Sequence, residues 1–179
     1  MQKKSGIVFV GVGDGGVSAM NQIINQHLNG LDFVAINTHE NGLKQSMAAT
    51  NLLSGGEVTR GLGAGGRMEM GESAAEASAD EIKETLQGAK KVIIVSALGG
   101  GTGTGASLVV GRVAGEIGAE SVAVVSCPFE YEGKQRREIA EKGVERLKDK
   151  VNKLIVVDNN DLLQFVPDLT IIENALDMA

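Results

Sequence analysis

The sequence is poor in aromatic residues and in cysteine. Of its 179 residues, none is tryptophan, one is tyrosine and four are phenylalanine, so aliphatic side chains must fill the core. The single cysteine, Cys127, has no internal disulfide partner, which favours a reducing compartment such as the cytoplasm. Because no histidine lies near Cys127 in the sequence, we interpret it as a core residue rather than a nucleophile.

Other absences exclude classes of function. Lys and Arg number 17 against 23 Asp and Glu, and this net charge of −6 argues against nucleic acid or an anionic membrane as the partner. No apolar run approaches the roughly 20 residues of a membrane-inserted helix. The sequence has no G-x-x-x-x-G-K-[ST] motif, no G-x-S-x-G motif and no Cys/His cluster with metal-ligand spacing. We therefore expect neither the usual P-loop nor a metal site built from protein ligands.

Glycine is abundant, with 25 residues that gather in clusters. The central cluster, GGGTGTG at Gly99–Gly105, follows the apolar run Val92–Val95 and precedes a helix-compatible segment. A flexible linker would lack its two threonines at fixed spacing. The first N–H groups of a helix are unpaired and lie at its positive end, so a loop that opens a helix binds phosphate without lysine. We predict such a phosphate loop, with threonine hydroxyls as extra donors, from Gly100, Gly101, Thr102, Gly103, Thr104 and Gly105.

A second glycine cluster, Gly11–Gly16, follows the apolar run Ile7–Val10. It satisfies G-x-G-x-x-G, so a dinucleotide-binding oxidoreductase is an alternative. That alternative needs a ribose-binding acid after the next strand, where Glu40 is a poor fit. Asp14 also places a negative charge in this cluster, which repels phosphate unless a metal or the orientation of the side chain intervenes.

Apolar runs and amphipathic segments alternate along the chain. This alternation predicts a Rossmann-like α/β fold, a mostly parallel sheet with helices on both faces. Because polar or glycine-rich loops follow the strands, we expect a ligand site at the carboxyl edge of the sheet. Strands are expected at 7–10, 33–36, 92–95, 121–127 and 154–157, and helices at 17–28, 72–86, 105–117, 134–151 and, as the start of another helix, about 170–179.

A long irregular stretch, Leu52–Gly71, is expected between the second strand and the next helix. Such stretches inside compact domains are usually functional or disordered. Within it, the N–H groups of Ala64, Gly65 and Gly66 offer a nest to a terminal phosphate. Arg60 and Arg67 either add positive charge to this nest or are solvated.

Three further polar segments follow strands or open helices. Asn37–Asn41 is a candidate edge of the site, in which His39 is interpreted as a solvated residue. Arg136 and Arg137 lie in a first helical turn, where their charge opposes the helix dipole and suggests an anionic partner. The cluster Asp158–Asp161 either hydrogen-bonds a base edge or caps a helix.

These segments together resemble the tubulin/FtsZ superfamily in its FtsZ form. The resemblance rests on GGGTGTG at Gly99–Gly105 and TRGLGAGG at Thr59–Gly66. Shorter matches occur in the same order at Asn37-Thr38, Pro128-Phe129, Glu132-Gly133, Arg136 and Leu162-Leu163 after Asn159. The resemblance covers nearly the whole chain. It implies that residues 1–179 are the amino-terminal GTP-binding domain of a self-assembling, filament-forming GTPase, which in FtsZ forms the cell-division ring.

The resemblance also implies roles for individual residues. The first cluster would contact the phosphates and guanosine through Gly11, Asp14, Gly15, Gly16, Val17 and Ser18. Ala64, Gly65 and Gly66 would lie by the γ-phosphate, and Gly101, Thr102 and Gly103 by the α- and β-phosphates. Glu132 and Arg136 would reach the ribose and Asn159 the guanine. Mg²⁺ would be held mainly by phosphate oxygens and water.

The chain departs from the family's pattern at several positions. Glycine is usual at Asp14, glycine and asparagine at Val17 and Ser18, Asp at His39, an Asn/Asp-Pro pair at Arg67-Met68, and a guanine-stacking Phe at Leu176. The resemblance further implies that the water-activating acids belong to a second domain outside this chain. We therefore expect other FtsZ-like subunits as partners, no catalytic residue and little hydrolysis by this chain alone. The alternative is an assembly or regulatory module that has lost nucleotide binding.

Overall fold

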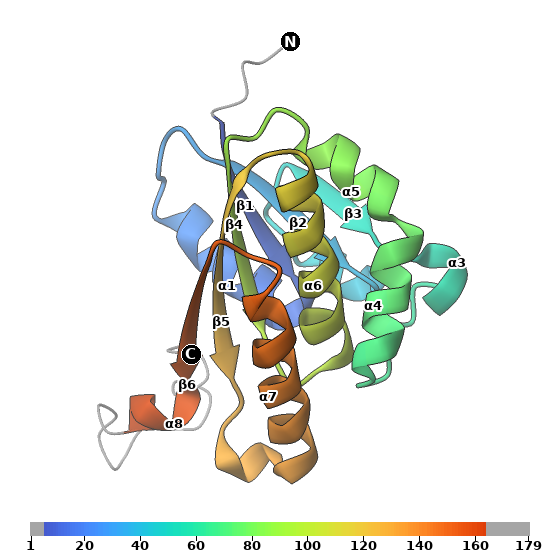
Figure 1. Cartoon of the computed structure of the whole chain (residues 1–179), viewed down its shortest axis with the longest axis vertical. Coiled ribbons are helices and arrows are strands. Elements are labelled where there is room, and N and C mark those ends of the chain that lie inside the picture. The colour runs from blue at the N-terminus through green and yellow to red at the C-terminus, as the bar shows by residue number, and fades with distance from the viewer. Residues whose placement is uncertain (1–5, 164–179) are drawn as a thin grey trace.

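The protein's structure, a computed structural model, describes residues 6–163 as a six-stranded sheet with flanking helices (Figure 1). The strand order is β3-β2-β1-β4-β5-β6, and every pairing in this sheet is parallel. The expected α/β class is therefore confirmed. The expectations at about 170–179 and at Leu176 lie outside the described residues. The strands are β1 (Ile7–Val12), β2 (Asp32–Asn37), β3 (Thr50–Leu53), β4 (Lys91–Ala97), β5 (Glu120–Cys127) and β6 (Lys153–Asp158).

Five strands coincide with the predicted apolar runs, and each extends slightly beyond its run. The sequence analysis missed β3, which lies within and just before the stretch expected to be irregular. Its first two residues, Thr50 and Asn51, are polar and exposed, because β3 is an edge strand with one neighbour. An edge strand needs little apolar surface, so its hydrophobic pattern is weak.

The helices differ from the predicted ranges mainly at their starts. The segment expected as one helix at 72–86 forms two helices, α4 and α5, which are separated at Ser78. The hydroxyl of Ser78 accepts a 2.9 Å hydrogen bond from the N–H of Gly55, so this break anchors a neighbouring loop. The helices are α1 (Gly13–Asn25), α2 (Glu40–Lys44), α3 (Gly56–Thr59), α4 (Met68–Ala77), α5 (Ala79–Leu86), α6 (Gly101–Glu116), α7 (Lys134–Lys148) and α8 (Asn159–Leu162), with a 3-10 turn at Glu130–Glu132.

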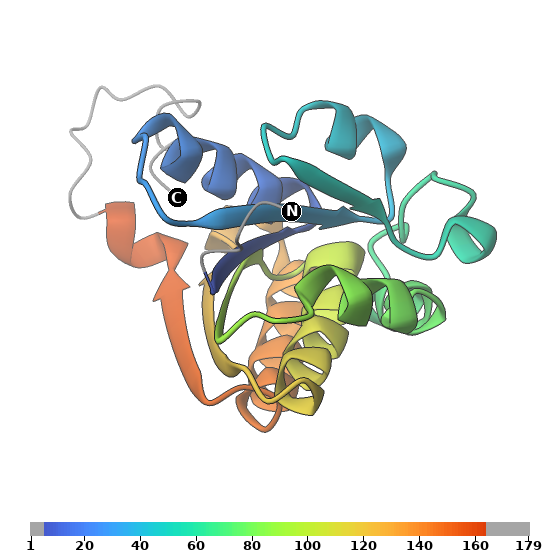
Figure 2. The ribbon, with the colours of Figure 1, turned by 90° about the horizontal axis from the view of Figure 1, so that it is seen from above.

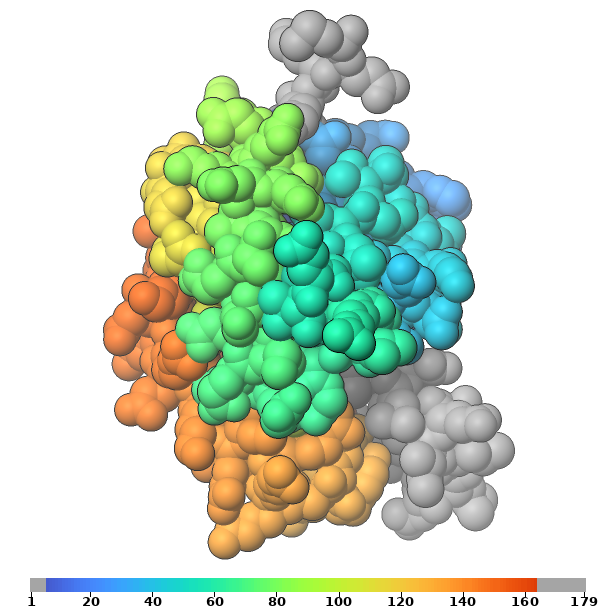
Figure 3. All heavy atoms as spheres, turned by 90° about the vertical axis from the view of Figure 1, so that its right-hand side faces the viewer, coloured from blue at the N-terminus to red at the C-terminus, as the bar shows by residue number. Residues whose placement is uncertain are grey.

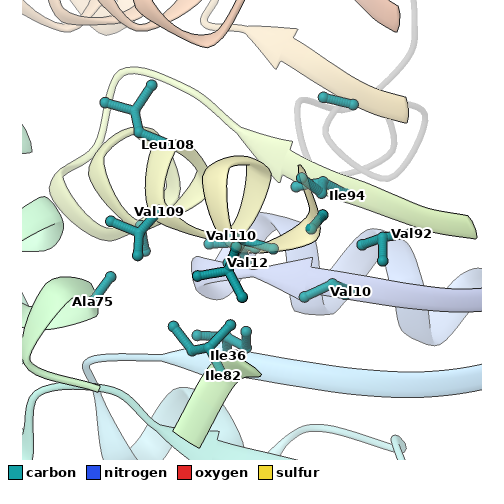
Figure 4. Close-up of a cluster of buried hydrophobic side chains, with 14 of the residues drawn as sticks. Val10, Val12, Ile36, Ala75, Ile82, Val92, Ile94, Leu108, Val109 and Val110 are labelled. Carbon is teal, nitrogen blue, oxygen red and sulfur yellow. The ribbon is translucent and has the colours of Figure 1, made fainter. Parts of the chain in front are cut away.

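Helices cover both faces of the sheet, as predicted. Figure 2 shows α1 on one face and α4 to α7 on the other. Figure 3 shows the side of the molecule where α4 and α5, in green, lie beside the teal and blue segments around β3, with orange atoms of the α7 region below. The main core lies between the sheet and α5 and α6, where Val10 and Ile94 of the strands meet Ile82, Val109 and Val110 of the helices (Figure 4).

The sheet has a topological switch point between β1 and β4. The connection after β1 leads to β2 on one side, whereas the connection after β4 leads to β5 on the other side. The helices that follow these strands, α1 and α6, therefore lie on opposite faces and begin at the same carboxyl edge. A crevice at such a point is where open α/β sheets bind ligands.

Candidate functional site

The starts of α1 and α6 meet at the switch point. Gly13, the first residue of α1, has φ +71°, and a Cβ there would lie 2.9 Å from the N atom of Gly103. Only glycine fits this contact, because an L side chain is strained at that φ and has no space. Val12 and Gly100 are the N-cap residues of α1 and α6, and neither gives a side-chain cap. The first N–H groups of both helices, which have no partner within their own helix, therefore lie at the same edge of the sheet.

The predicted glycine loops are wrong as loops. Gly11 belongs to β1 and pairs with Ala35 and Val95, while Gly15 and Gly16 lie in the first turns of α1. In the central cluster only Gly99 and Gly100 precede the helix, since α6 begins at Gly101. Each cluster is a direct strand-to-helix junction with almost no loop.

Close packing explains why helical turns here are made of glycine. A Cβ on Gly103 would collide with the carbonyl oxygen of Ala97, and one on Gly105 with that of Met68. A Cβ on Gly101 would lie 2.7 Å from the Cβ of Ala64. These glycines let α6 approach β4 and α4 closely. Gly105 therefore has a packing role that the sequence analysis did not foresee. Gly11 has one too, because a Cβ there would lie 2.8 Å from the carbonyl oxygen of Gly16.

The two threonines of the central cluster differ in exposure. Thr104 is 1% exposed, and its hydroxyl accepts a 2.9 Å hydrogen bond from the N–H of Gly99. Its expected role as a phosphate donor is therefore corrected to an internal one. The Thr102 hydroxyl shares a 2.5 Å hydrogen bond with the hydroxyl of Thr38 at the end of β2. Thr102 thus joins the start of α6 to the Asn37–Asn41 segment.

The carboxylate of Asp14 is oriented toward that same segment. Its Oδ1 accepts a 2.7 Å hydrogen bond from Nδ2 of Asn37, which is 1% exposed, and its Oδ2 lies 4.0 Å from Nδ1 of His39. His39, expected to be solvated, is half-buried and has this acidic neighbour. These contacts hold the negatively charged carboxylate of Asp14 to one side of α1. The carboxylate has space there because Gly42, which lies against it, has no Cβ. Val17, Ser18, Asp14 and His39 line a small cavity of about 210 Å³ there.

The Ala64–Gly66 segment reaches the same edge. Ala64 is buried against Gly101, as the 2.7 Å approach shows, whereas Gly65 and Gly66 are exposed with φ values of +58° and +74°. Neither of their N–H groups donates to another group within residues 6–163. The adjoining turn is tied to the end of β2, since the N–H of Gly63 donates to the carbonyl of Thr38 at 3.0 Å. Arg60 and Arg67 are exposed.

A groove of about 760 Å³ runs from this junction across the sheet beside α1. Four of the sequence-predicted residues line it: Gly15, Ser18, Glu132 and Asn159. Asn159 is only 7% exposed, and its Oδ1 is buried without a hydrogen-bond partner in the described part of the chain. A buried acceptor without a partner is costly and marks a place where a ligand donor fits.

The two basic candidate residues at the start of α7, Arg136 and Arg137, form ion pairs. Nη1 of Arg136 lies 2.9 Å from Oε2 of Glu132, so Arg136 pairs with a groove residue. Arg137 instead donates to both carboxylate oxygens of Asp158, at 3.4 and 2.6 Å. This contact lowers the pKa of Asp158. The Asp158 carboxylate also accepts from the N–H of Asn160 at 3.0 Å, which is the helix-cap interpretation of this cluster, realised for α8 at Asn159–Leu162.

Cys127 lies in the main core, as predicted. Burial raises the pKa of its thiol, which keeps it protonated and unreactive. Within residues 6–163, no helix has the length and apolarity that crossing a membrane requires.

The comparisons with known proteins agree with this geometry. The family model described as "Tubulin/FtsZ family, GTPase domain" matches residues 6–167. This chain belongs to the tubulin/FtsZ family. A solved structure of FtsZ from M. jannaschii, titled as an empty dimer, is 41% identical with a TM-score of 0.93, and the match covers 99% of this chain. CetZ2 from Haloferax volcanii, titled as a GTPγS-bound protofilament, is 25% identical over 96% of this chain, with a TM-score of 0.83.

The chain spans about half the length of these tubulin/FtsZ relatives, 52% of the FtsZ chain and 53% of the CetZ2 chain. The fold and the family are thus shown for a unit of domain size. The sequence analysis named Arg137 and the Asp158–Asp161 segment separately, but it missed that Arg137, Asp158 and Asn160 form one polar cluster beside the groove. The signals were the basic residues at the start of a helix and the polar segment after a strand.

Proposed function

We propose that residues 1–179 form a guanine-nucleotide-binding domain that holds GTP or GDP at the carboxyl edge of the sheet. The observation that carries this proposal is the contact between the uncapped starts of α1 and α6, where Gly13 approaches Gly103. In this proposal, N–H groups of Gly101, Thr102 and Gly103 bind the α- and β-phosphates. The exposed amides of Gly65 and Gly66 bind the γ-phosphate.

Asn159 supports guanine as the base. Its partnerless Oδ1 requires a hydrogen-bond donor, and guanine offers its N1–H and 2-amino groups. We assign the 2-amino group to Asn159, with Glu132 and its ion-pair partner Arg136 toward the ribose. Ser18 and Gly15 line the same groove and complete the nucleoside site.

Mg²⁺ enters with the nucleotide in this proposal, held by phosphate oxygens and water. Within residues 11–18 and 99–105, Asp14 is the one ionisable side chain, which fits a cation brought by the triphosphate. The ion would offset the negative charges of the phosphates and of Asp14.

Hydrolysis by this chain alone is proposed to be weak or absent. The resemblance to FtsZ assigns the acids that activate water to a second domain on a neighbouring subunit. The FtsZ dimer and CetZ2 protofilament structures support self-association with FtsZ-like subunits as part of the proposal. We further propose a cytoplasmic role in cell division, for which FtsZ is the precedent.

The direct test is the nucleotide that leaves the purified protein on denaturation, identified by chromatography, followed by calorimetric titration with GTP and GDP. We expect guanine nucleotide to be released on denaturation, and we expect GTP and GDP to bind in the titration. Asn159→Ala should weaken GTP binding about tenfold, the value of one hydrogen bond to a buried group. The exposed Asn25→Ala at the end of α1 serves as the matched control and should leave affinity unchanged. A wild-type chain that binds neither nucleotide contradicts the proposal.

A second candidate is an assembly or regulatory module without nucleotide. Asp14 favours it, because a carboxylate in the first turn of α1 opposes phosphate binding. This candidate predicts co-sedimentation with a full-length homologue to the same extent with and without GTP. A requirement for GTP in that assay would exclude it.

A further inference from the structure

A polar network at the base end of the groove links three separate elements. Asp158 closes β6, Arg137 lies in α7, and Asn160 follows in α8. The two guanidinium bonds to Asp158 are joined by bonds from the N–H of Asn160 at 3.0 Å and from its Nδ2 at 2.8 Å. The carboxylate thus takes four donors, three on its Oδ1 and one on its Oδ2, and each comes from Arg137 or Asn160.

The network continues into the turn that carries Glu132. Oδ1 of Asn160 accepts a 3.0 Å hydrogen bond from the N–H of Glu130 at the start of the 3-10 turn. Both walls of the groove at this end, the Glu130–Glu132 turn and α8, are therefore held by one continuous set of bonds. Asn159 lies between Asp158 and Asn160 in the sequence, so its backbone is fixed on both sides.

This arrangement matters because no hydrogen bond within residues 6–163 orients the Oδ1 of Asn159. The direction of this buried side chain is therefore set by packing and by the position of its backbone. Within residues 6–163, every donor to the Asp158 carboxylate comes from Arg137 or Asn160, so the network ties the backbone on both sides of Asn159. Arg137 joins this network to α7, where its guanidinium also lies 3.7 Å from Oε1 of Glu141.

We propose that the Arg137–Asp158 pair, with Asn160, is a positioning device that aims Asn159 at the 2-amino group of guanine and so sets base specificity. This inference rests on the proposed function. It makes Arg137 a positioning residue, since the guanidinium contacts Asp158 and not the nucleotide. Base discrimination is then controlled from α7, on the side of the sheet opposite α1.

The test compares GTP with inosine 5′-triphosphate, which differs only by lacking the 2-amino group. Calorimetric titration of the wild-type chain should show about tenfold tighter binding of GTP, the fold-change for one hydrogen bond to a buried acceptor. Arg137→Met should weaken GTP about tenfold and change the affinity for inosine triphosphate less than threefold, so the discrimination disappears. Arg137→Lys keeps the charge without the two-pronged geometry and should restore part of it.

Arg146→Met is the matched control. Arg146 lies in the same helix and makes an equivalent two-pronged ion pair with Glu72, at 2.6 and 2.8 Å, on the side facing α4. This variant should keep full discrimination. Asp158→Asn tests the pair from its other end and should lose the discrimination between the two nucleotides just as Arg137→Met does. If one of these variants fails to fold, the other still tests the proposal. Circular dichroism establishes folding for each variant.

The outcomes separate the two proposals. A wild-type chain that binds no guanine nucleotide overturns the proposed function, and this inference with it. A wild-type chain that discriminates, with Arg137→Met and Asp158→Asn retaining the same ratio or losing both nucleotides equally, overturns the positioning role alone. Loss of the ratio in Arg146→Met as well would likewise overturn it, because the effect would then be general to α7.

Discussion

The glycines at the start of α6 and those at Gly65 and Gly66 serve different physical needs. Gly103 has a helical backbone and is buried, and a Cβ there would collide with the carbonyl oxygen of Ala97. Gly65 and Gly66 have positive φ values, are exposed and have no atom within 4 Å of a built Cβ. At Gly103 the missing side chain leaves space for close packing. At Gly65 and Gly66 glycine instead permits the positive φ values. Substitutions should therefore separate stability from ligand binding in the two regions.

Gly103→Ala should have the largest effect. The added methyl group has no space between α6 and β4, and overpacking of this kind costs about 3 kcal/mol of the free energy of unfolding. We expect a large fall in stability in urea denaturation, with loss of nucleotide binding. Gly115→Ala, in the same helix with no neighbour within 4 Å, should instead be neutral or stabilising by up to about 1 kcal/mol. Equal stability of the two variants would contradict the packing explanation.

Gly66→Ala should have a smaller and more selective effect. Alanine at φ +74° costs roughly 1 kcal/mol of stability, and the strain distorts the nest proposed for the γ-phosphate. We expect GTP to bind about tenfold more weakly while GDP binds as before, measured by titration. Gly88→Ala, with φ +85° and equally open space in the turn before β4, carries the same strain without a change in either affinity. If GDP binding falls together with GTP binding, Gly66 does not contact the γ-phosphate.

Asp14→Asn should strengthen nucleotide binding. The amide keeps a hydrogen-bonding group near Asn37 and His39 while one negative charge leaves the phosphate edge. We expect about threefold to tenfold tighter GTP binding at low salt without Mg²⁺, and a smaller gain with Mg²⁺ or at high salt. Asp80→Asn in the first turn of α5 is the control and should change nothing. An unchanged affinity in Asp14→Asn would show that the carboxylate does not act on the phosphates.

The smallest effect is expected in the pH dependence of stability. Arg137 lowers the pKa of Asp158 from its ordinary value of 3.8, so the pair stabilises the fold above that pH. This contribution, small because solvent screens the exposed pair, is lost as the pH falls from 3.8 through the lowered pKa. Thermal melts of wild type and Arg137→Met should therefore differ at pH 7 and converge toward pH 3. A difference that persists undiminished at pH 3 would assign it to packing instead.

The fold was predictable where one stretch of sequence decides the outcome. Buried parallel strands have no polar face, so the runs around Val10, Ile94 and Val124 predicted three of the sheet's strands directly. β3 was missed because its edge position demands little apolar surface. The break at Ser78 was missed because alanines and acids continue a helical pattern through it, whereas the hydrogen bond from Gly55 to the Ser78 hydroxyl is a contact with a distant segment.

The candidate site, like the fold, was predictable from the sequence only in part. The glycine clusters and polar segments predicted which parts of the chain gather at one edge, and the structure brings Gly13, Thr102, Ala64 and Asn159 there. The sequence did not indicate that Thr104 is internal, because its exposure depends on how α6 packs against neighbouring elements. It did not indicate that Arg137 pairs with Asp158, because this contact joins α7 to the end of β6.

The sequence by itself determined the alternation of buried strands and helices, the family and the segments at the ligand edge, since these follow from local patterns of apolar residues and glycine. Only the tertiary structure decided where α1 and α6 begin. Glycine disfavours a helix locally, yet α1 begins at Gly13 and α6 at Gly101, because close contact with neighbouring backbone is available to a residue without a side chain. That preference arises from packing between distant segments, which no local pattern encodes.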